Sequence, residues 1–142
     1  MFENTGMGRL NYLLEKTMDV ESLRKKVIAN NIANVDVPHF KRSEVNFESE
    51  LQRVIREKAD PSNRFQARMT DERHIPFHVE RDVRGVRPRI NLDYSTTLRN
   101  DGNNVDIEKE TVDAAKTQMR YNAYVNMLNQ NYKVLKLAMR PA

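Results

Sequence analysis

Two histidines near the middle of the chain are the first candidates for chemistry, because imidazole is a common metal ligand. His74 and His78 stand four residues apart, a spacing that places two ligands on one face of a helix. Pro76 lies between them and argues against a helix, because proline lacks the backbone N–H that a helix needs. The chain has no cysteine and no obvious third ligand. We therefore predict that these histidines lie in loops or strands, and we predict no metal site and no cofactor.

A group of carboxylates, Asp106, Glu108 and Glu110, is the second candidate. Catalysis would need a neighbouring nucleophile or a base with an orienting partner, and the sequence contains no such pattern. Acidic residues also stabilise the first turn of a helix, where backbone N–H groups carry partial positive charge. We therefore interpret these residues as the start of a helix. We assign no catalytic residue and expect no small-molecule substrate.

The stretch RDVRGVRPR, residues 81–89, is the third candidate, because its four arginines and one aspartate could contact phosphates. An arginine-rich RNA-binding protein is therefore one hypothesis. The stretch has no aromatic residues that could stack on bases, and the whole chain has a formal net charge of only +4. We favour contact with an acidic face of another protein subunit, with no nucleic-acid partner.

The composition indicates long helices with wide solvated faces more than a compact globule. Of the 142 residues, 39% are hydrophobic and 31% are charged, and tryptophan is absent. The N-terminal residues lack the basic stretch and continuous apolar run of an ordinary cleaved signal peptide. No apolar run is long enough to span a membrane. Taken alone, these features predict a cytosolic protein.

Amphipathic periodicity predicts one long helix from Gly8 to Asn34. Asparagine-rich residues end it, and asparagine tolerates the left-handed conformation found after helices. Pro38 biases the preceding residue towards an extended conformation, so the chain should turn into a basic, aromatic strand. The apolar stripe of this helix comprises Leu10, Leu13, Leu14, Val20, Val27, Ile28 and Ile32.

A second long helix is predicted after the turn at Asp101 and Gly102, with Asn104 or Asp106 as its cap. Its stripe repeats every 3.5 residues over four heptads, as in a coiled coil, and is polar only at Thr111 and Gln118. The apolar residues of this stripe are Ala114, Tyr121, Val125, Leu128, Tyr132, Leu135 and Met139.

The sequence therefore predicts a mainly α fold in which the two long helices pair as a coiled-coil-like hairpin. Residues 1–59 hold the first helix, the turn and a shorter helix capped by Asn46. Residues 60–100 form an irregular insert with short strands, and residues 101–142 the C-terminal helix. Both ends of the chain should form one structural domain, with leftover apolar surface directed to neighbouring chains.

Two motifs add a family resemblance to this physical interpretation. ANNIANVDVPHFK resembles the N-terminal signature of flagellar rod, hook and hook-filament proteins, and DGNNVDIEKE resembles the start of the C-terminal helix in rod members. Val37 stands where the signature usually has threonine. His39 stands where it usually has glycine, so the turn either avoids positive φ or strains to reach it. The candidate assembly residues are Asn30, Asn31, Ile32, Ala33, Asn34, Pro38, Phe40 and Lys41 in the first motif, and Gly102, Asn103, Asn104, Val105, Asp106 and Glu110 in the second.

The resemblance implies a structural, non-enzymatic subunit of the proximal rod of the flagellar basal body. It implies export by the flagellar type III apparatus without a cleaved signal peptide, and a periplasmic location that replaces the cytosolic one. The implied partners are other copies of the chain, other rod subunits, the adaptor between rod and membrane ring, the export gate and the membrane ring itself. The rod would transmit torque and continue the export channel. A generic coiled-coil adaptor remains the alternative alongside the RNA-binding protein.

Overall fold

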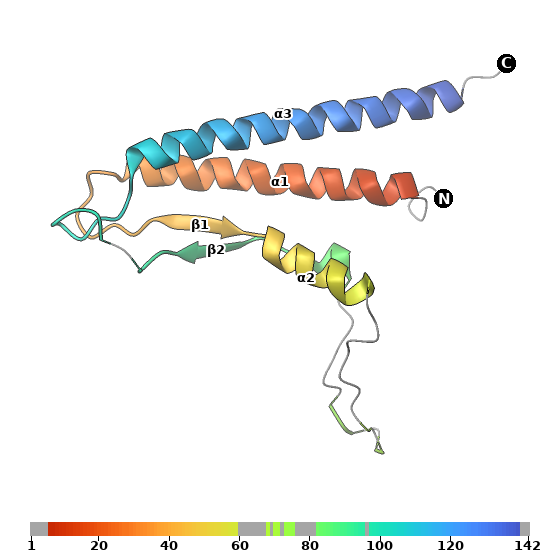
Figure 1. The fold of residues 1–142 in the computed structure, drawn as a ribbon, viewed down its shortest axis with the longest axis horizontal. Helices are drawn as coiled ribbons and strands as arrows, with labels where there is room; N and C mark the ends of the chain where they lie inside the picture. Colours follow the sequence, from red (N-terminus) through yellow and green to blue (C-terminus); the bar gives the residue numbers. More distant parts are fainter. Residues whose placement is uncertain are drawn as a thin grey trace. The chain divides into compact units, whose positions relative to one another are not determined.

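The computed structural model describes residues 6–59, 68, 70, 71, 73–75, 82–95 and 97–139. It confirms the mainly α fold with a long helix at each end of the chain (Figure 1). The elements in chain order are α1 (Gly6–Ala33), β1 (Ser43–Asn46), α2 (Glu48–Ala59), the 3₁₀ helix η3 (Val83–Gly85), β2 (Arg89–Leu92) and α3 (Ile107–Ala138).

The chain divides into two compact units. The first comprises Met1–Val45 and Ile90–Ala142, and the second comprises Asn46–Arg89. These divisions lie away from the boundaries at 59/60 and 100/101 that we predict from the sequence. The segment after β2 contacts the N-terminal half, since the Asp93 backbone N–H donates to the Arg42 carbonyl at 2.8 Å.

Helices α1 and α3 lie side by side and antiparallel in the first unit, since the end of α1 lies beside the start of α3 (Figure 1). The predicted helical hairpin is therefore confirmed. Most apolar residues of the predicted stripe on α3 lie on its covered side, but the two polar positions of the stripe do not. Thr117 is 1% exposed, whereas its neighbour Gln118 is exposed, and Glu110 is buried in place of Thr111. Polar side chains can take inward positions when hydrogen bonds within the unit satisfy them.

Polar contacts continue along the hairpin. The Asn131 side-chain amide donates to Oδ1 of Asn11 at 2.9 Å. Nearer the middle, Lys25 donates to the Gln118 side chain and lies 5.2 Å from the centre of the Tyr121 ring. A polar residue in a helix–helix seam specifies register, because sliding the helices would break its bond.

The helix starts only partly follow the sequence interpretation. Asp106 caps α3 as predicted, with Oδ1 accepting the backbone N–H groups of Glu108 and Lys109. Asn46 was predicted to cap the shorter helix, but it is the last residue of β1, and α2 begins two residues later at Glu48. The Asn46 side chain instead accepts a hydrogen bond from the Ser49 hydroxyl at 2.6 Å. None of the helices that the structure describes is apolar over a length sufficient to cross a bilayer.

Candidate functional site

Five polar residues meet where α1 ends and α3 begins, and we call them the polar cluster: Asn31, Arg42, Asn103, Asn104 and Glu110. Asn31, Asn103 and Glu110 are 0% exposed, and Asn104 is 2% exposed. Buried polar groups are costly unless hydrogen bonds satisfy them. Each member of the cluster must therefore be explained by its bonds.

Asn31, on the last turn of α1, binds the edge of β1 as a neighbouring strand would. Its side-chain nitrogen donates to the Ser43 carbonyl at 2.8 Å, and its Oδ1 accepts the Ser43 N–H at 3.0 Å. The same nitrogen donates to Oε2 of Glu110 at 3.1 Å. A single amide thus joins α1, β1 and α3.

Glu110 and Arg42 form the charged pair of the cluster. Arg42 Nε lies 2.5 Å from Glu110 Oε1, and Arg42 Nη1 lies 2.7 Å from Oε2 of the exposed Glu44. Burial opposes the charge on Arg42, yet hydrogen bonds and attraction to Glu110 and Glu44 outweigh it and raise the Arg42 pKa above its ordinary value. Our interpretation of Glu110 as helix-start electrostatics was therefore incomplete, because its carboxylate is enclosed and ion-paired.

Asn104 was one of two predicted caps for α3, but Asp106 takes that position. Asn104 instead joins Arg42, the residue just before β1, to Asp93, the residue just after β2. Its Oδ1 accepts the Arg42 backbone N–H at 2.7 Å, and its side-chain nitrogen donates to the Asp93 carbonyl at 2.7 Å. The Asn104 side chain thus takes the place of a direct hydrogen bond from the Arg42 backbone N–H to the Asp93 carbonyl, where the two strands separate.

Asn103 binds the asparagine-rich turn. Its side-chain nitrogen lies within hydrogen-bond distance of three carbonyl oxygens, those of Asn34 at 3.1 Å and of Val35 and Val37 at 2.9 Å. Its Oδ1 accepts the Val105 N–H at 2.8 Å. The amide therefore holds together the carbonyl groups of the turn that follows α1.

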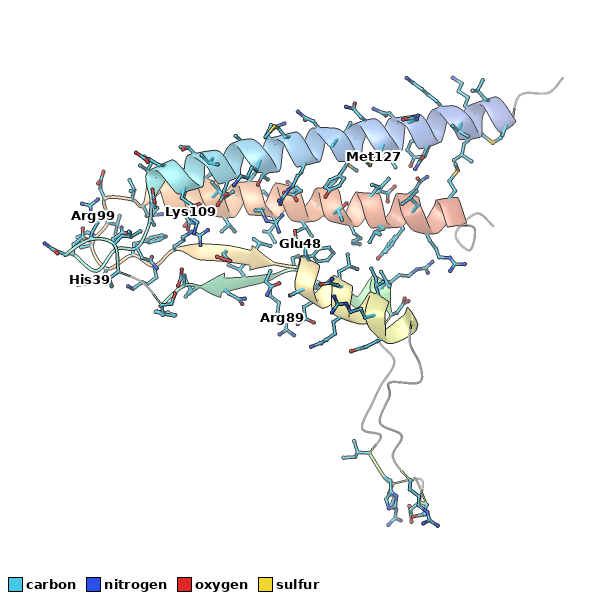
Figure 2. All side chains as sticks on the ribbon, viewed as in Figure 1. His39, Glu48, Arg89, Arg99, Lys109 and Met127 are labelled. Carbon is cyan, nitrogen blue, oxygen red and sulfur yellow. The ribbon has the colours of Figure 1, made fainter. Side chains whose placement is uncertain are left out.

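His39 and Gly102 form a second contact between the two motifs. His39 lies in the loop region beside the end of α1 and the start of α3 (Figure 2). Both have positive φ, 60° for His39 and 80° for Gly102, so the turn reaches the left-handed region despite the missing glycine. A Cβ on Gly102 would lie 2.9 Å from His39 Nδ1. The His39 N–H donates to the Asp101 carbonyl at 3.0 Å, and Lys41 Nζ donates to the Gly102 carbonyl at 2.8 Å.

The other predicted motif residues differ in burial and bonding. Asn34 donates to the Asn30 carbonyl at 2.7 Å. Ile32 and Phe40 are half-buried, whereas Ala33 and Pro38 are exposed. Val105 is buried at 4% exposure.

The predicted apolar stripes are unevenly covered within the chain. On α1, Leu10 is 47% exposed and Leu13 is half-buried, and four residues are buried: Leu14, Val20, Val27 and Ile28. On α3, Tyr132 and Met139 are 48% and 67% exposed, and four residues are half-buried: Tyr121, Val125, Leu128 and Leu135.

The hydrogen bonds of the polar cluster hold its side chains in fixed positions. Both oxygens of its carboxylate are bound, Oε1 to Arg42 and Oε2 to Asn31. Across the described residues, no three histidine, cysteine, aspartate or glutamate side chains gather as metal ligands. His74 is exposed and accepts the Thr70 N–H at 3.3 Å, whereas His78 and Arg81 lie outside the described residues.

Two contributors to this site were missed from the sequence. Arg42 looked like part of a basic strand, and Asp93 like part of the insert. A useful signal was the pairing of the two motifs: asparagines in both, with an acid in one and an arginine beside the other, suggest partners for each other. The amide types alone do not show which atoms meet.

A helical hairpin whose two long helices are fastened to each other by two sequence motifs, where α1 ends and α3 begins, defines a class of structural assembly protein. Comparison with known proteins shows which family of this class the chain resembles. Residues 12–41 match the flagella basal body rod protein family. The chain is 42% identical to the flagellar basal body rod protein FlgB of Borrelia hermsii, over 90% of this chain and 93% of the relative. It is 34% identical to FlgB of Borreliella burgdorferi, over 87% of this chain and 90% of the relative. For FlgB of Bacillus subtilis the identity is 33%, over 87% of both chains.

The chain belongs to the FlgB family of flagellar basal body rod proteins. It is accordingly a structural subunit of the basal-body rod, in a family that is not enzymatic. Its place is the flagellar basal body, where it assembles with other basal-body components. Nothing in the structure or the relatives favours a generic adaptor or an RNA-binding protein.

Proposed function

We propose that this subunit self-assembles into the proximal part of the rod, transmits torque along the flagellar axis and continues the export channel. A shaft under torsion needs subunits whose helices keep a fixed register. The observation that supports this role is the polar cluster, which ties residues 31, 42 and 103–110 together at one end of the hairpin.

The polar cluster would hold the end of α1 and the start of α3 in a fixed position relative to each other. Breaking a buried ion pair by removing one partner costs about 3–5 kcal/mol, because the other charge is left uncompensated. Load applied to one helix would therefore pass to the other without the helices separating. The exposed apolar side chains of α3 give the hairpin surface for neighbours, with Met119, Met127 and Leu137 at 63%, 55% and 66% exposure.

We further propose that the partners are other copies of the chain, other rod subunits, the adaptor between rod and membrane ring, the export gate and the membrane ring. The location would be periplasmic, reached through the type III apparatus without removal of a signal peptide. The resemblance of both motifs to flagellar axial proteins supports this route.

Purified basal bodies test the proposal. A strain that expresses the chain with a small C-terminal epitope should yield basal bodies in which antibody labels the membrane-proximal end of the rod. Mass spectrometry of the same particles should recover peptides from the first residues of the chain. Label at the distal rod or hook, or a chain that begins beyond the first helix, would contradict the proposed position or route.

A further inference from the structure

Four elements of the first unit lie side by side in a row. Figure 1 shows them in the order α3, α1, β1 and β2. The contacts agree with this order, since α1 packs on α3, Asn31 of α1 bonds to Ser43 of β1, and β1 pairs with β2. Helix α3 and strand β2 are therefore the outer elements of the row. Each has a side that no other described residue of the unit covers.

The outer side of α3 carries an apolar stripe. Glu110 and Thr117 are buried in the hairpin, and Val112 and Met119 follow each of them by two residues, which is about 200° around a helix. Val112 and Met119 therefore point away from α1, and they are 52% and 63% exposed. The stripe continues in steps of one or two helical turns through three more exposed residues: Met127, Val134 and Leu137.

The exposed face of β2 is apolar as well. The strands are antiparallel (Figure 1), and the hydrogen bond between Asp93 and Arg42 sets a register in which Ile90 lies opposite Val45. Residues that lie opposite each other project from the same face of a sheet. Val45 is buried, whereas Ile90 and Leu92 are 54% and 52% exposed. The apolar face that is buried on β1 therefore continues, exposed, on β2.

Hydrogen bonds within the unit show that the start of the α3 stripe and Leu92 lie at the same level along the hairpin. Asn31 binds the backbone of Ser43, which lies opposite Leu92, at 2.8 Å and 3.0 Å. The same side chain binds Glu110, two residues before Val112, at 3.1 Å. Val112 and Leu92 therefore share one level, on opposite sides of the row.

Met119 and Ile90 share a second level. Arg24 donates at 3.5 Å to the carbonyl of the β1 residue opposite Ile90, and it pairs with Glu21 at 2.8 Å. Arg120, the neighbour of Met119, lies 4.0 Å from the same carboxylate. The two levels are about 10 Å apart on the helix and about 7 Å apart on the strand, a difference that a flexible methionine can absorb.

We propose that the outer side of α3 in one copy packs on the exposed face of β2 in the next copy, with Val112 on Leu92 and Met119 on Ile90. The contact deepens the proposed self-assembly and rests on it in naming another copy as the partner. It joins unlike surfaces, so every copy keeps one surface of each kind for a further neighbour. All copies then point in the same direction, and the row continues as a ring or a helix, as a rod of one polarity requires. A helix in this place would also cover the open edge of β2.

The charges near the contact support the pairing of unlike surfaces. The ribbon carries Glu44, whose side chain is 57% exposed, and the half-buried Asp93. Opposite charges on the two sides of a contact favour the correct partner. The charged residues of α3 outside the hairpin seam are mainly basic, with five bases and two acids: Lys109, Lys116, Arg120, Lys133, Lys136, Glu108 and Asp113.

Cross-linking in basal bodies tests the contact, because the chain has no cysteine of its own. Purified basal bodies whose chain carries Ile90→Cys and Met119→Cys should give a ladder of joined copies with a short thiol-to-thiol reagent. Ile90→Cys with Leu137→Cys is the matched control, since Leu137 is exposed on the same stripe but lies about 27 Å further along the helix. No ladder from the first pair, or an equal ladder from the control, would overturn the proposal.

Single-cysteine variants test whether the joined surfaces are unlike. Ile90→Cys alone and Met119→Cys alone should give no covalent dimer, whereas their co-expression should give dimers and nothing larger. A dimer from either variant alone would mean that like surfaces meet, which would overturn the proposal. If the chain with both substitutions does not enter the rod, Leu92→Cys with Val112→Cys tests the other level in the same way.

A charge pair tests the contact without a reagent. Leu92→Glu and Val112→Lys should each lower the amount of chain in basal bodies about tenfold, because each places an unpaired charge in an apolar contact. Combined in one chain, they place glutamate against lysine and should restore rods and motility. Both positions are exposed within the unit, so circular dichroism of the purified variants should match that of the unmodified chain. Full assembly of both single variants, or no recovery in the combined variant, would overturn the pairing.

The same particles distinguish this contact from the wider proposal. If the chain is present in the rod but gives no ladder at either level, the contact fails while self-assembly stands. An adduct of Met119→Cys with a different flagellar protein, in place of the ladder, would assign the stripe to that partner and overturn the contact between copies. If the unmodified chain is absent from the rod, the proposed function fails.

Discussion

The side-chain nitrogen of Asn31 lies 3.1 Å from Oε2 of Glu110, and both side chains are fully enclosed although 79 residues separate them. The bond joins the last turn of the N-terminal helix to the first turn of the C-terminal helix. Each residue belongs to one of the two motifs that resemble flagellar axial proteins. The motifs are thus two halves of one packing arrangement.

Removing the Glu110 side chain should cause a large loss of stability. Glu110→Ala leaves Arg42, whose side chain is 12% exposed, without its buried partner. We expect the free energy of unfolding to fall by about 3–5 kcal/mol in urea titrations followed by circular dichroism. Lys116→Ala, which breaks only an exposed pair with Asp113, should change it by less than about 0.5 kcal/mol. If the two variants lowered the free energy of unfolding by similar amounts, the polar cluster would not make the large contribution to stability that we expect.

A double-mutant cycle isolates the ion pair. Arg42→Met with Glu110→Leu replaces both charges by apolar groups, so the double variant should lose clearly less than the sum of the single losses. We expect a coupling of about 1–3 kcal/mol. Additive losses would mean that the two side chains contribute independently.

Asn103 should be more sensitive to charge than to truncation. Asn103→Ala removes a donor from the carbonyls of Asn34, Val35 and Val37, at about 1–3 kcal/mol. Asn103→Asp should destabilise further, because it directs a carboxylate at these oxygens. Thermal unfolding of the three proteins gives the order, and an Asp variant more stable than the Ala variant would contradict this account of the turn.

The close approach of Gly102 and His39 predicts non-additive effects. Gly102→Ala combines a φ of 80° with a Cβ 2.9 Å from His39 Nδ1, so it should cost about 1–3 kcal/mol. In a His39→Gly background that Cβ meets no imidazole, and the cost should fall by about 1 kcal/mol. The measurement is urea unfolding of both single variants and the double variant. An unchanged cost would show that backbone strain at residue 102 accounts for the whole effect.

Asp93 gives the pH prediction. Its pKa lies below the ordinary 3.8, first because the Ser95 hydroxyl donates to its carboxylate and second because the Ser95 N–H does. A lowered folded-state pKa stabilises the turn above the unfolded value, and that contribution is lost as the pH falls through the folded value. Ser95→Ala should move the Asp93 pKa up towards 3.8 in an NMR titration, and Ser95→Thr should leave it low. An unmoved pKa in Ser95→Ala would exclude the hydroxyl as the main cause.

The helix seam predicts an assembly defect. Leu128 is half-buried against the hairpin, and Leu128→Asp would place a carboxylate in that apolar contact, at about 2–5 kcal/mol. Because every subunit of a rod repeats the loss, we expect exported protein with no rod and no motility. Lys133→Asp, at an exposed position, should be tolerated unless a neighbour covers that face. Normal swimming of the Leu128→Asp strain would count against the seam.

Periodicity predicted the helices well, because burying an apolar stripe determines where a helix lies. It did not predict which polar residues turn inward. Thr117 is buried where the apolar repeat favoured Gln118, and Glu110 is enclosed although its position suited a solvated first turn. Such positions depend on partners far away in the sequence, and Arg42 is 68 residues from Glu110. Local patterns carry no information about that distance.

The long sequence separation within the polar cluster also sets an order of events. A ribosome makes the chain from its N-terminus, so Asn31 and Arg42 emerge long before Glu110. Until residue 110 is available, α1 has no partner for its inward face, and Arg42 has no enclosed counter-charge. Contacts of such high separation close slowly, since the entropy of a long loop is lost before they form. The hairpin therefore cannot form during most of the synthesis of the chain. It forms only after α3, the last helix to be made, is available.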